Sequence, residues 1–348
     1  MEFLEISQEQ FTAFAAEETT SFLQTPQMAD MLAKRGYKLN FLAVTINDKI
    51  KMAALITSIS VSGGAKLEIN FGPIGNFDQV IFNYFIQELK KYAKNHQVLE
   101  VKVRPDINYM VFDSKGQALE EANESFISEM KKLGLTYNGR HVGYEEQDAV
   151  AEWQYIKDLS EITDEASLLK SYNSNAKRNV KKAIKNEVIV RAATYDELAE
   201  VERLIGNTGE KRHFATKDLD YYQELYTAFG DNIEFLLTFQ GGTAIAAGVF
   251  IEVNREFLYL YGGSDGAYGK LGGPFLMQHT AMLHALERQL VTYNFYGISG
   301  KFDGSDGVLK FKQNFGGYIT QKVGEFSYYP QPIKYKIIQG IKKLLGRV

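Results

Sequence analysis

The sequence has no cysteine, one tryptophan and only six prolines among its 348 residues. The absence of cysteine excludes disulfides, thiolate nucleophiles and cysteine metal sites, and it is typical of a cytoplasmic protein. No apolar run approaches the roughly 18 residues needed to cross a bilayer. The first ten residues carry acidic side chains where a secretory signal is basic, and they lack an apolar core, so we expect a cytoplasmic protein.

The charge balance is slightly acidic, with 39 Lys and Arg against 43 Asp and Glu and a formal net charge of −4. This balance disfavours a protein that coats nucleic acid, although local basic patches stay open. With 45% hydrophobic and 24% charged residues, the composition is typical of a globular protein. The length exceeds one ordinary core, and therefore we expect two domains.

One order of predicted elements occurs twice: a helix, a two-strand hairpin, a third strand, a second helix and a further strand. The first helix of each copy stops at a glycine, Gly36 or Gly230, and each hairpin turns at Asn47-Asp48 or Gly241-Gly242. The glycine stops and the turns of the two copies have the same separation along the chain. Two copies of one mixed α/β domain are therefore predicted.

This order of elements is similar to that of the GNAT (acyl-CoA N-acyltransferase-like) fold, whose central sheet opens to take an acyl donor. A polar stretch and a short helix follow the first copy, and we place the domain boundary near residue 150. The prediction is a GNAT-like domain 1 over residues 1–150, completed by the C-terminal segment 320–348, and a GNAT-like domain 2 over residues 151–319. The fold alone assigns no chemistry.

A glycine-rich segment near the C-terminus, Phe302 to Gly317, is a candidate for the reaction centre. Its Asp and Gly residues are typical of turns. Between the turns, the alternation from Val308 to Phe315 predicts a short strand that presents Phe311 and Lys312. A lysine held there can place one positive charge against a developing anion. A solvated strand with lysines on its wet face is the alternative.

A basic stripe is predicted on a helix at the start of the second copy. Its five cations follow helical spacing, while Ala176, Val180, Ala183 and Ile184 lie toward another face. The stripe consists of Lys177, Arg178, Lys181, Lys182 and Lys185. It is a candidate contact for a phosphate backbone, and a solvated helix face is the alternative.

The last residues, from Ile333, predict an amphipathic helix after Pro330 and Pro332. Its apolar side would hold Ile337, Ile338, Ile341, Leu344 and Leu345, and its basic side Lys336, Lys342, Lys343 and Arg347. Such an end can lie on an anionic membrane surface. Docking onto its own domain is the interpretation that we favour.

Several familiar sites are missing from the sequence. Gly269-Lys270 resembles the end of a phosphate loop, but Leu271 stands where Ser or Thr would hold magnesium. His279 and His284 are too far apart for one helix face, and neither an HExxH nor a GxSxG motif occurs. The segment that would cradle the pyrophosphate of coenzyme A, from Gly269 to Pro274, departs from the R/Q-x-x-G-x-G/A pattern. We expect no metal and no cofactor.

Seven segments carry a resemblance to a known family: SNAKRNVKKAIKNEV, FATKDLDYY, YLYGGSDGAYGKLGGPFLMQ, YNFYGISG and GVLKFKQNFGG in the second copy, and FLQTP and VRPDINY in the first. Together they resemble the Fem family (FemABX) of non-ribosomal peptidyl transferases, over most of the chain. The resemblance implies an aminoacyltransferase that moves an amino acid from aminoacyl-tRNA to the stem-peptide amine of a peptidoglycan precursor. That precursor is UDP-MurNAc-pentapeptide or its lipid-linked form. Because no heptad-bearing insertion occurs, the chain is similar to the short, armless FemX-like type.

The resemblance also implies roles for single residues. Lys312, which follows Phe311, matches a lysine that stabilises the negative charge formed when the aminoacyl ester is attacked. Lys217 stands where the family usually has an arginine on the precursor diphosphate, and lysine cannot make the planar bidentate contact. The precursor-binding positions carried over are Lys217, Tyr221, Tyr109, Tyr261 and Lys34. The basic stripe is expected to meet the tRNA acceptor stem.

Three alternatives stay open at this point. They are a coenzyme A-dependent GNAT-type N-acyltransferase, an enzyme of the same family that acts on a lipid-linked precursor at the inner face of the membrane, and a binding module for cell-wall precursors without catalysis. A monomer is expected. No general base is evident, because Asp106 and Asp303 both resemble turn residues.

Overall fold

The chain folds into two compact units, each built around one mixed sheet. The computed structural model describes residues 1–143, 150–212 and 216–344. Unit 1 consists of residues 1–109, 122–141 and 322–348, and unit 2 of residues 110–121 and 142–321. We propose that these units are the two predicted domains.

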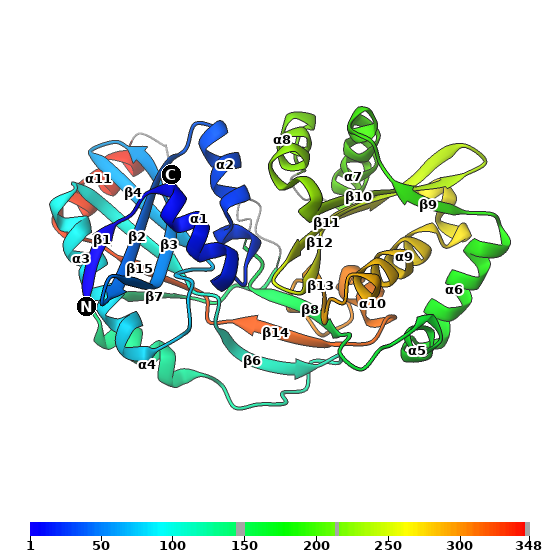
Figure 1. The fold of residues 1–348 in the computed structure, drawn as a ribbon, viewed down its shortest axis with the longest axis horizontal. Helices are drawn as coiled ribbons and strands as arrows, with labels where there is room; N and C mark the ends of the chain where they lie inside the picture. The colour runs from blue at the N-terminus through cyan, green and yellow to red at the C-terminus, as the bar shows by residue number, and fades with distance from the viewer. Residues whose placement is uncertain (144–149, 213–215, 345–348) are drawn as a thin grey trace. The chain divides into compact units, whose positions relative to one another are not determined.

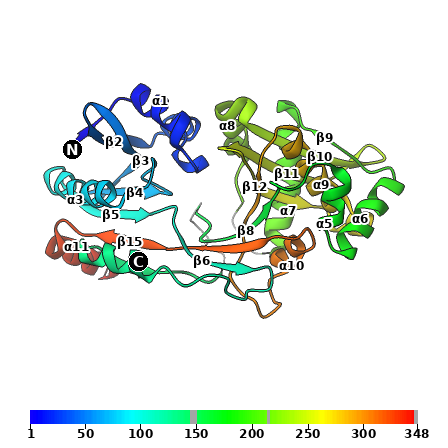
Figure 2. The same ribbon diagram turned by 60° about the horizontal axis from the view of Figure 1, so that its bottom comes forward.

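Unit 1 is a sheet with the strand order β1-β2-β3-β4-β5-β15-β7 (Figure 1). Its strands are β1 (Glu2–Glu5), β2 (Lys38–Ile46), β3 (Lys49–Val61), β4 (Gly64–Asn70), β5 (Val98–Arg104), β7 (Thr136–Gly139) and β15 (Glu325–Tyr328). Its helices are α1 (Gln8–Glu18), α2 (Pro26–Lys34), α3 (Gln79–Asn95), α4 (Glu124–Lys132) and α11 (Pro332–Leu344). Helix α11 lies against β5 (Figure 2).

Unit 2 is a sheet with the strand order β6-β14-β8-β13-β12-β11-β10-β9. Its strands are β6 (Asn108–Asp113), β8 (Trp153–Asp158), β9 (Ile189–Ala192), β10 (Ile233–Gln240), β11 (Thr243–Val253), β12 (Glu256–Ser264), β13 (Thr292–Gly297) and β14 (Tyr318–Lys322). Its helices are α5 (Glu165–Ser171), α6 (Ser174–Lys185), α7 (Leu198–Arg212), α8 (Leu219–Phe229), α9 (Gly273–Glu287) and α10 (Gly307–Gln313).

The two predicted hairpins are present with the predicted turns. In β2–β3 the central residues Asn47 and Asp48 have φ values of 49° and 61°, and in β10–β11 Gly241 and Gly242 have 53° and 83°. Two successive residues with positive φ match the right-handed twist of the strands that they join. The turn chemistry therefore fixes the register of both hairpins.

Helices cover both faces of the unit 2 sheet, with α7 and α8 on one side and α9 and α10 on the other (Figure 1). One glycine of β12 allows this close packing. A Cβ on Gly263 would lie 2.3 Å from the backbone oxygen of Leu204 in α7. Any larger residue at Gly263 would push α7 away from the sheet.

In the described part of the chain the longest helix is α3, with 17 residues. No helix in that part is both long enough and apolar enough to cross a bilayer.

The segment after Asp306 is a helix, so the predicted strand from Val308 to Phe315 is wrong. Asp306 is the N-cap of α10, and its Oδ1 accepts hydrogen bonds from the backbone amides of Val308 (2.8 Å) and Leu309 (3.0 Å). These bonds satisfy the first free amides of the helix. Leu309 and Lys312 then share the buried face of α10 at helical spacing, and Phe315, just after the helix, is also buried.

Two other apolar faces differ from the prediction. On α6, Ile184 is 57% exposed, whereas Ala176, Val180 and Ala183 are buried. On α11, the predicted apolar side divides, because Ile338 is half-buried while Ile337, Ile341 and Leu344 are exposed. Leu345 and Arg347 lie outside the described residues. Docking of this helix onto unit 1 therefore uses only part of its apolar surface.

Candidate active site

The candidate active site lies in unit 2, where two neighbouring parallel strands separate. In the described chain, β12 and β13 pair from Glu256 with Thr292 to Leu258 with Asn294, and no further. The corresponding strands of unit 1, β4 and β5, pair over six residues, from Ala65 to Asn70. The opening expected of a GNAT-like sheet is thus a property of unit 2.

A strained bulge in β13 follows the point of separation. The register between β13 and β8 shifts after Asn294, and Tyr296 has a φ of 60°. Positive φ is costly for a bulky residue, and such strain concentrates at functional sites. At this bulge the backbone oxygens of Tyr296 and Gly297 accept hydrogen bonds from α10.

Lys312 of α10 binds both of these carbonyl groups. Its Nζ donates to the backbone oxygen of Tyr296 (3.2 Å) and to that of Gly297 (2.5 Å). The side chain is only 4% exposed, and this burial lowers the pKa of Lys312 to about 7, although Asp306 opposes the shift. An ammonium has three N–H donors, so one direction around Nζ is left after the two carbonyls.

Asp306 and Phe311 hold the helix that carries Lys312. The Asp306 Oδ2 accepts hydrogen bonds from the backbone amide (2.9 Å) and hydroxyl (2.7 Å) of Ser299, just after β13. Phe311 packs edge-on against Phe275 of α9, with ring centroids 5.0 Å apart. The sequence predicted Phe311 as part of the catalytic pair, and in the structure its ring is a packing contact.

A second buried lysine, Lys157 of β8, was not predicted. Its Nζ donates to the backbone oxygen of Phe315 and to the hydroxyl of Ser171, both at 2.8 Å. Burial lowers its pKa to about 8. Because Phe315 follows α10, Lys157 satisfies a carbonyl at the C-terminal end of the same helix that Lys312 ties to β13. Nothing in the sequence distinguishes this lysine from one on a solvated strand.

Three of the predicted precursor-binding residues come together in unit 2. The hydroxyl groups of Tyr221 (α8) and Tyr261 (β12) are 3.1 Å apart, and the Nζ of Lys217 lies 5.2 Å from the centre of the Tyr221 ring. Burial raises the pKa of Tyr261 well above its ordinary value, and Tyr221 and Tyr296 add to the shift. The Tyr261 phenol is therefore a neutral hydrogen-bonding group at physiological pH.

The other two predicted precursor contacts belong to unit 1. Tyr109 is buried, donates a 2.6 Å hydrogen bond to Glu124, and carries the Arg140 guanidinium 3.5 Å above its ring. Lys34 is exposed in the last turn of α2. Both assignments stay predictions.

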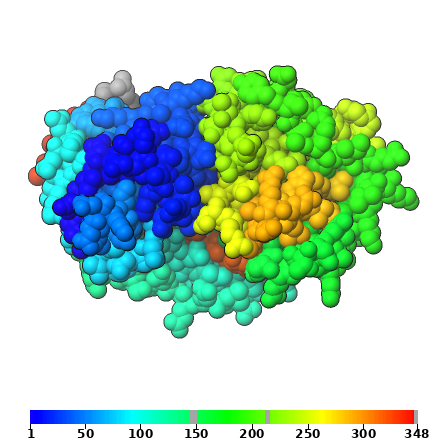
Figure 3. Space-filling view, in the orientation of Figure 1, coloured from blue at the N-terminus to red at the C-terminus, as the bar shows by residue number. Residues whose placement is uncertain are grey.

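The basic stripe lies on α6, as predicted. Arg178, Lys181, Lys182 and Lys185 are exposed, whereas Lys177 is half-buried and donates to the backbone oxygen of Lys170 (3.1 Å). In the space-filling view the green segment of α6 is at the surface beside the orange α9 (Figure 3). The four exposed cations are thus available to a polyanion.

Asparagines connect this basic helix to α10. Asn314 accepts hydrogen bonds at its side-chain oxygen from Asn173 (3.1 Å) and Asn175 (2.9 Å), and its backbone oxygen accepts from the amide of Asn173 (3.0 Å). The Asn314 side-chain amide in turn donates to the backbone oxygens of Lys310 and Phe311. The start of α6 is thereby fixed against the end of the helix that carries Lys312.

Helix α6 also covers the beginning of α9, where a GNAT enzyme would cradle a pyrophosphate. A Cβ on Gly272, the N-cap of α9, would lie 2.5 Å from the backbone oxygen of Asn179 in α6. A helix N-terminus favours anions, but here a carbonyl oxygen already packs against it. This arrangement disfavours a coenzyme A site of the ordinary GNAT type.

The remaining candidate residues have structural contacts. Asp303 accepts hydrogen bonds from the amide and hydroxyl of Ser305, as a turn aspartate does, and Asp106 forms a 2.6 Å ion pair with Lys322. His279 is buried between Tyr172 and Glu165, and burial lowers its pKa. His284 pairs with Glu234, which raises its pKa. These contacts give none of the four residues a position beside Lys312.

Comparison with known proteins agrees with this geometry. The chain is 26% identical to aminoacyltransferase FemA of Staphylococcus aureus over the whole length of both, and 25% identical to aminoacyltransferase FemB of Staphylococcus epidermidis over 97% of this chain and 99% of that protein. The alignment with FemA spans 423 positions against 348 residues here, so FemA carries segments that this chain lacks.

Solved structures give the same answer for the fold. The crystal structure of FemX superposes with a TM-score of 0.81 at 19% identity, covering 97% of this chain and all of FemX. A tandem GNAT protein from the clavulanic acid pathway has a TM-score of 0.54 at 9% identity, over 95% of this chain and 99% of that one. The predicted fold of tandem GNAT-like domains and the predicted class of aminoacyltransferase are confirmed. The FemAB family model matches residues 6–240 and 238–343, and the chain therefore belongs to the FemAB family.

Proposed function

We propose that this protein transfers an amino acid from aminoacyl-tRNA to the stem-peptide amine of a peptidoglycan precursor, in the synthesis of cell-wall cross-bridges. The single observation that carries the proposal is the buried Lys312, bonded to the strained bulge where β12 and β13 separate. Its pKa of about 7 suits a group that exchanges a proton near neutral pH. Two further features of the same unit support the proposal: the basic helix α6 suits the tRNA, and the tyrosine cluster suits the precursor.

Lys312 takes part in two steps of the reaction. Both steps use the one direction around Nζ that the two carbonyl groups leave open. As a neutral amine, it keeps two N–H donors on the carbonyls of Tyr296 and Gly297 and presents its lone pair to the substrates. The attacking amine forms a C–N bond with the ester carbonyl, and Lys312 accepts a proton from the resulting ammonium.

The protonated Lys312 then faces the oxyanion of the tetrahedral intermediate. A donor so placed stabilises an oxyanion by about 3 to 4 kcal/mol. When the C–O bond to the ribose breaks, Lys312 returns its proton to the departing ribose oxygen and is neutral again. This sequence supplies the general base that neither Asp106 nor Asp303 is placed to provide.

The exposed cations of α6 receive the tRNA acceptor stem. Arg178, Lys181, Lys182 and Lys185 can each meet a phosphate, and contacts of this kind position a nucleic acid without reading its sequence. The hydrogen bonds from Asn173 and Asn175 to Asn314 then hold the bound tRNA at a fixed position relative to the helix that carries Lys312.

The precursor meets the cluster of Lys217, Tyr221 and Tyr261. Lys217 supplies a point charge for a diphosphate, and the two phenol groups supply hydrogen bonds. Lys34 and Tyr109 of unit 1 are proposed as further contacts. We also propose that the protein works as a monomer in the cytoplasm, at the inner face of the membrane when its precursor is lipid-linked.

The test is a transfer assay with a panel of charged tRNAs and UDP-MurNAc-pentapeptide or its lipid-linked form, with the product read by mass spectrometry. A mass gain of one amino acid on the precursor supports the proposal. Transfer from acetyl-CoA to a small amine, with no reaction from any aminoacyl-tRNA, would replace it with a coenzyme A-dependent acyltransferase. Tight precursor binding without transfer from either donor would leave a binding module.

A further inference from the structure

The C-terminal helix α11 has two apolar faces, and only one of them is used inside the protein. Ile338 lies on the inner face: its side chain is 2.6 Å from the position of a Cβ on Gly63, in the turn between β3 and β4. Tyr335 packs on Tyr329, with ring centroids 4.4 Å apart. These contacts hold α11 on the sheet of unit 1.

The outer face is apolar and open to solvent. Ile333, Ile337, Ile341 and Leu344 are 77%, 58%, 50% and 87% exposed. At about 100° per residue, these four side chains fall within about 80° of one another on the helix. Four large aliphatic side chains in one exposed stripe are unusual on a surface that meets only water.

Positive charge borders this stripe on both sides. Lys334 lies beyond Ile341 around the helix, and Lys336 and Lys343 lie on the opposite border. All three lysines are exposed, and α11 contains no acidic residue. The chain as a whole carries a net charge of −4, so this helix has the opposite charge to the rest of the protein.

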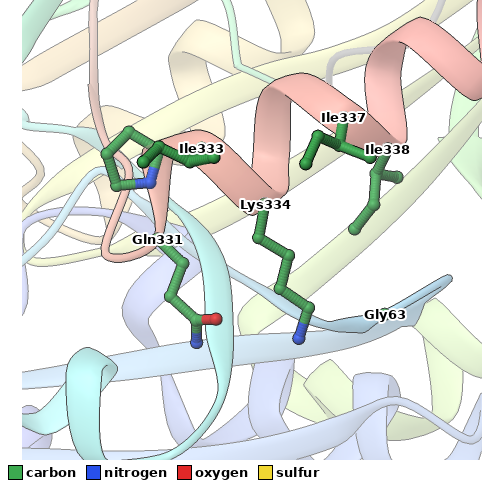
Figure 4. Close-up of a pocket in the computed structure, with 7 residues that line it drawn as sticks. Gly63, Gln331, Ile333, Lys334, Ile337 and Ile338 are labelled. Atoms are coloured by element: carbon green, nitrogen blue, oxygen red, sulfur yellow. The ribbon is translucent and has the colours of Figure 1, made fainter.

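A shallow groove runs along the start of the stripe. It has a volume of about 550 Å³ and is lined by Gly63, Gln331, Pro332, Ile333, Lys334, Ile337 and Ile338. Figure 4 shows Ile333, Ile337 and Lys334 around this groove. An aliphatic wall with an ammonium at its side matches the boundary between acyl chains and phosphate headgroups.

We propose that α11 is an interfacial helix that docks unit 1 onto the surface of an anionic phospholipid bilayer. The stripe of Ile333, Ile337, Ile341 and Leu344 enters the headgroup boundary, and Lys334, Lys336 and Lys343 contact the lipid phosphates. Charge complementarity selects this occupant, because an apolar stripe between cations suits an anionic surface better than a neutral peptide or a second copy of the same basic helix. The inference adds a membrane contact to the proposed transferase and does not depend on the transfer reaction.

The experiment is co-sedimentation of the full chain with vesicles, in the absence of tRNA and precursor. Phosphatidylcholine vesicles are compared with vesicles that also contain phosphatidylglycerol. We expect binding to the anionic vesicles only, with a loss of about five-fold in the partition coefficient for each lysine replaced by glutamine. Raising the salt concentration should weaken the binding, since the screening length shortens.

Ile337→Asp is the variant that tests the apolar stripe, and Ile184→Asp is its matched control. Both isoleucines are exposed to nearly the same degree, 58% and 57%, and both lie on lysine-rich helices. The proposal expects Ile337→Asp to lose vesicle binding while Ile184→Asp keeps it. Circular dichroism and thermal melting check that both variants fold, which their exposure favours.

Other outcomes would overturn the inference. Equal binding by both variants, or equal binding to both kinds of vesicle, removes α11 as the contact. The wild type could instead fail to bind vesicles and form dimers that Ile337→Asp disrupts, as measured by sedimentation velocity. In that case the partner of the apolar stripe is a second copy of the chain. Transfer to a soluble precursor is measured in parallel and should be unchanged in Ile337→Asp, so the proposed function stands or fails separately.

Discussion

The side-chain amide of Asn175 donates a 2.9 Å hydrogen bond to the side-chain oxygen of Asn314. This bond joins the basic helix α6 to the end of the helix that carries Lys312. If tRNA binds α6, the bond also relates the tRNA position to the reaction centre. Two nearby contacts of Asn314, to Asn173 and to the carbonyl of Phe311, belong to the same network.

We predict that Asn175→Ala and Asn314→Ala lower turnover more than they raise the Michaelis constant for aminoacyl-tRNA. Each variant removes a hydrogen bond between α6 and α10 but no exposed cation, so the bound tRNA is misplaced and not lost. A fall in turnover of about ten-fold would fit a displacement of this kind. The double variant should be little worse than Asn314→Ala alone, because both changes break one link. Fully additive effects would contradict a shared link.

Replacing Lys312 should reduce catalysis without unfolding the protein. We expect Lys312→Ala to lower turnover by about a hundred-fold or more, as loss of one oxyanion donor does, with precursor affinity nearly unchanged. Lys312→Arg separates the two proposed steps, because arginine keeps a cation but does not release a proton. Steady-state kinetics for both variants, with precursor binding by calorimetry, provide the measurement.

The pH dependence of the rate tests the proton transfer directly. In the wild type, kcat/KM should rise through pH of about 7 as Lys312 loses its proton and becomes a base. That inflection should be missing in Lys312→Arg. If the wild-type rate instead falls as the pH rises through this region, Lys312 acts only as a fixed cation.

Much of the fold could be predicted from the sequence, because the turns and helix stops carry local signals. The Asn47-Asp48 and Gly241-Gly242 turns identified both hairpins and, through them, the repeat. The error at α10 arose because Phe311, Lys312 and Phe315 were interpreted as strand alternation, while the N-cap signal of Asp306 before Gly307 was not used.

The site was predicted less completely, because its main features are tertiary. Lys312 was identified from the glycine-rich segment around it, whereas Lys217, Tyr221 and Tyr261 were identified only through family resemblance. The positive φ of Tyr296 and the burial of Lys157 depend on strands distant in the sequence, and no local pattern encodes either. The division of α11 into an inner and an outer apolar face likewise depends on Gly63, far away in the chain.

Burial of Lys312 should also make stability depend on pH. Its pKa falls from 10.5 to about 7 on folding, so between these values the unfolded chain binds more protons than the native protein. The resulting penalty on the native state is full below pH of about 7 and disappears above pH of about 10. We expect Lys312→Met to be stabilised relative to the wild type by about 2 to 4 kcal/mol more at pH 7 than at pH 10, at roughly 1.4 kcal/mol per pKa unit.

Urea unfolding of the wild type and Lys312→Met at several pH values measures this difference. The lost bonds to Tyr296 and Gly297 add a cost to the variant that does not vary with pH, so only the slope is informative. Lys157, whose pKa is lowered to about 8, should give a smaller total change between pH 7 and pH 10 by the same reasoning. If the free energies of unfolding of the variant and the wild type change in parallel with pH, Lys312 is not a buried titrating group.

Charge reversal on the basic stripe of α6 tests the tRNA contact. We expect Lys181→Glu with Lys185→Glu to raise the Michaelis constant for aminoacyl-tRNA by ten-fold or more at low salt, with little change for the precursor. Each lysine that meets a phosphate contributes about 0.7 to 0.9 to the slope of log affinity against log salt concentration, so the slope should flatten by about 1.5. The control is Lys49→Glu with Lys51→Glu, two exposed lysines at the β2–β3 hairpin that give the same change in net charge. If the control flattens the slope as much as the α6 variant, the effect comes from overall charge, and α6 is an ordinary solvated helix face.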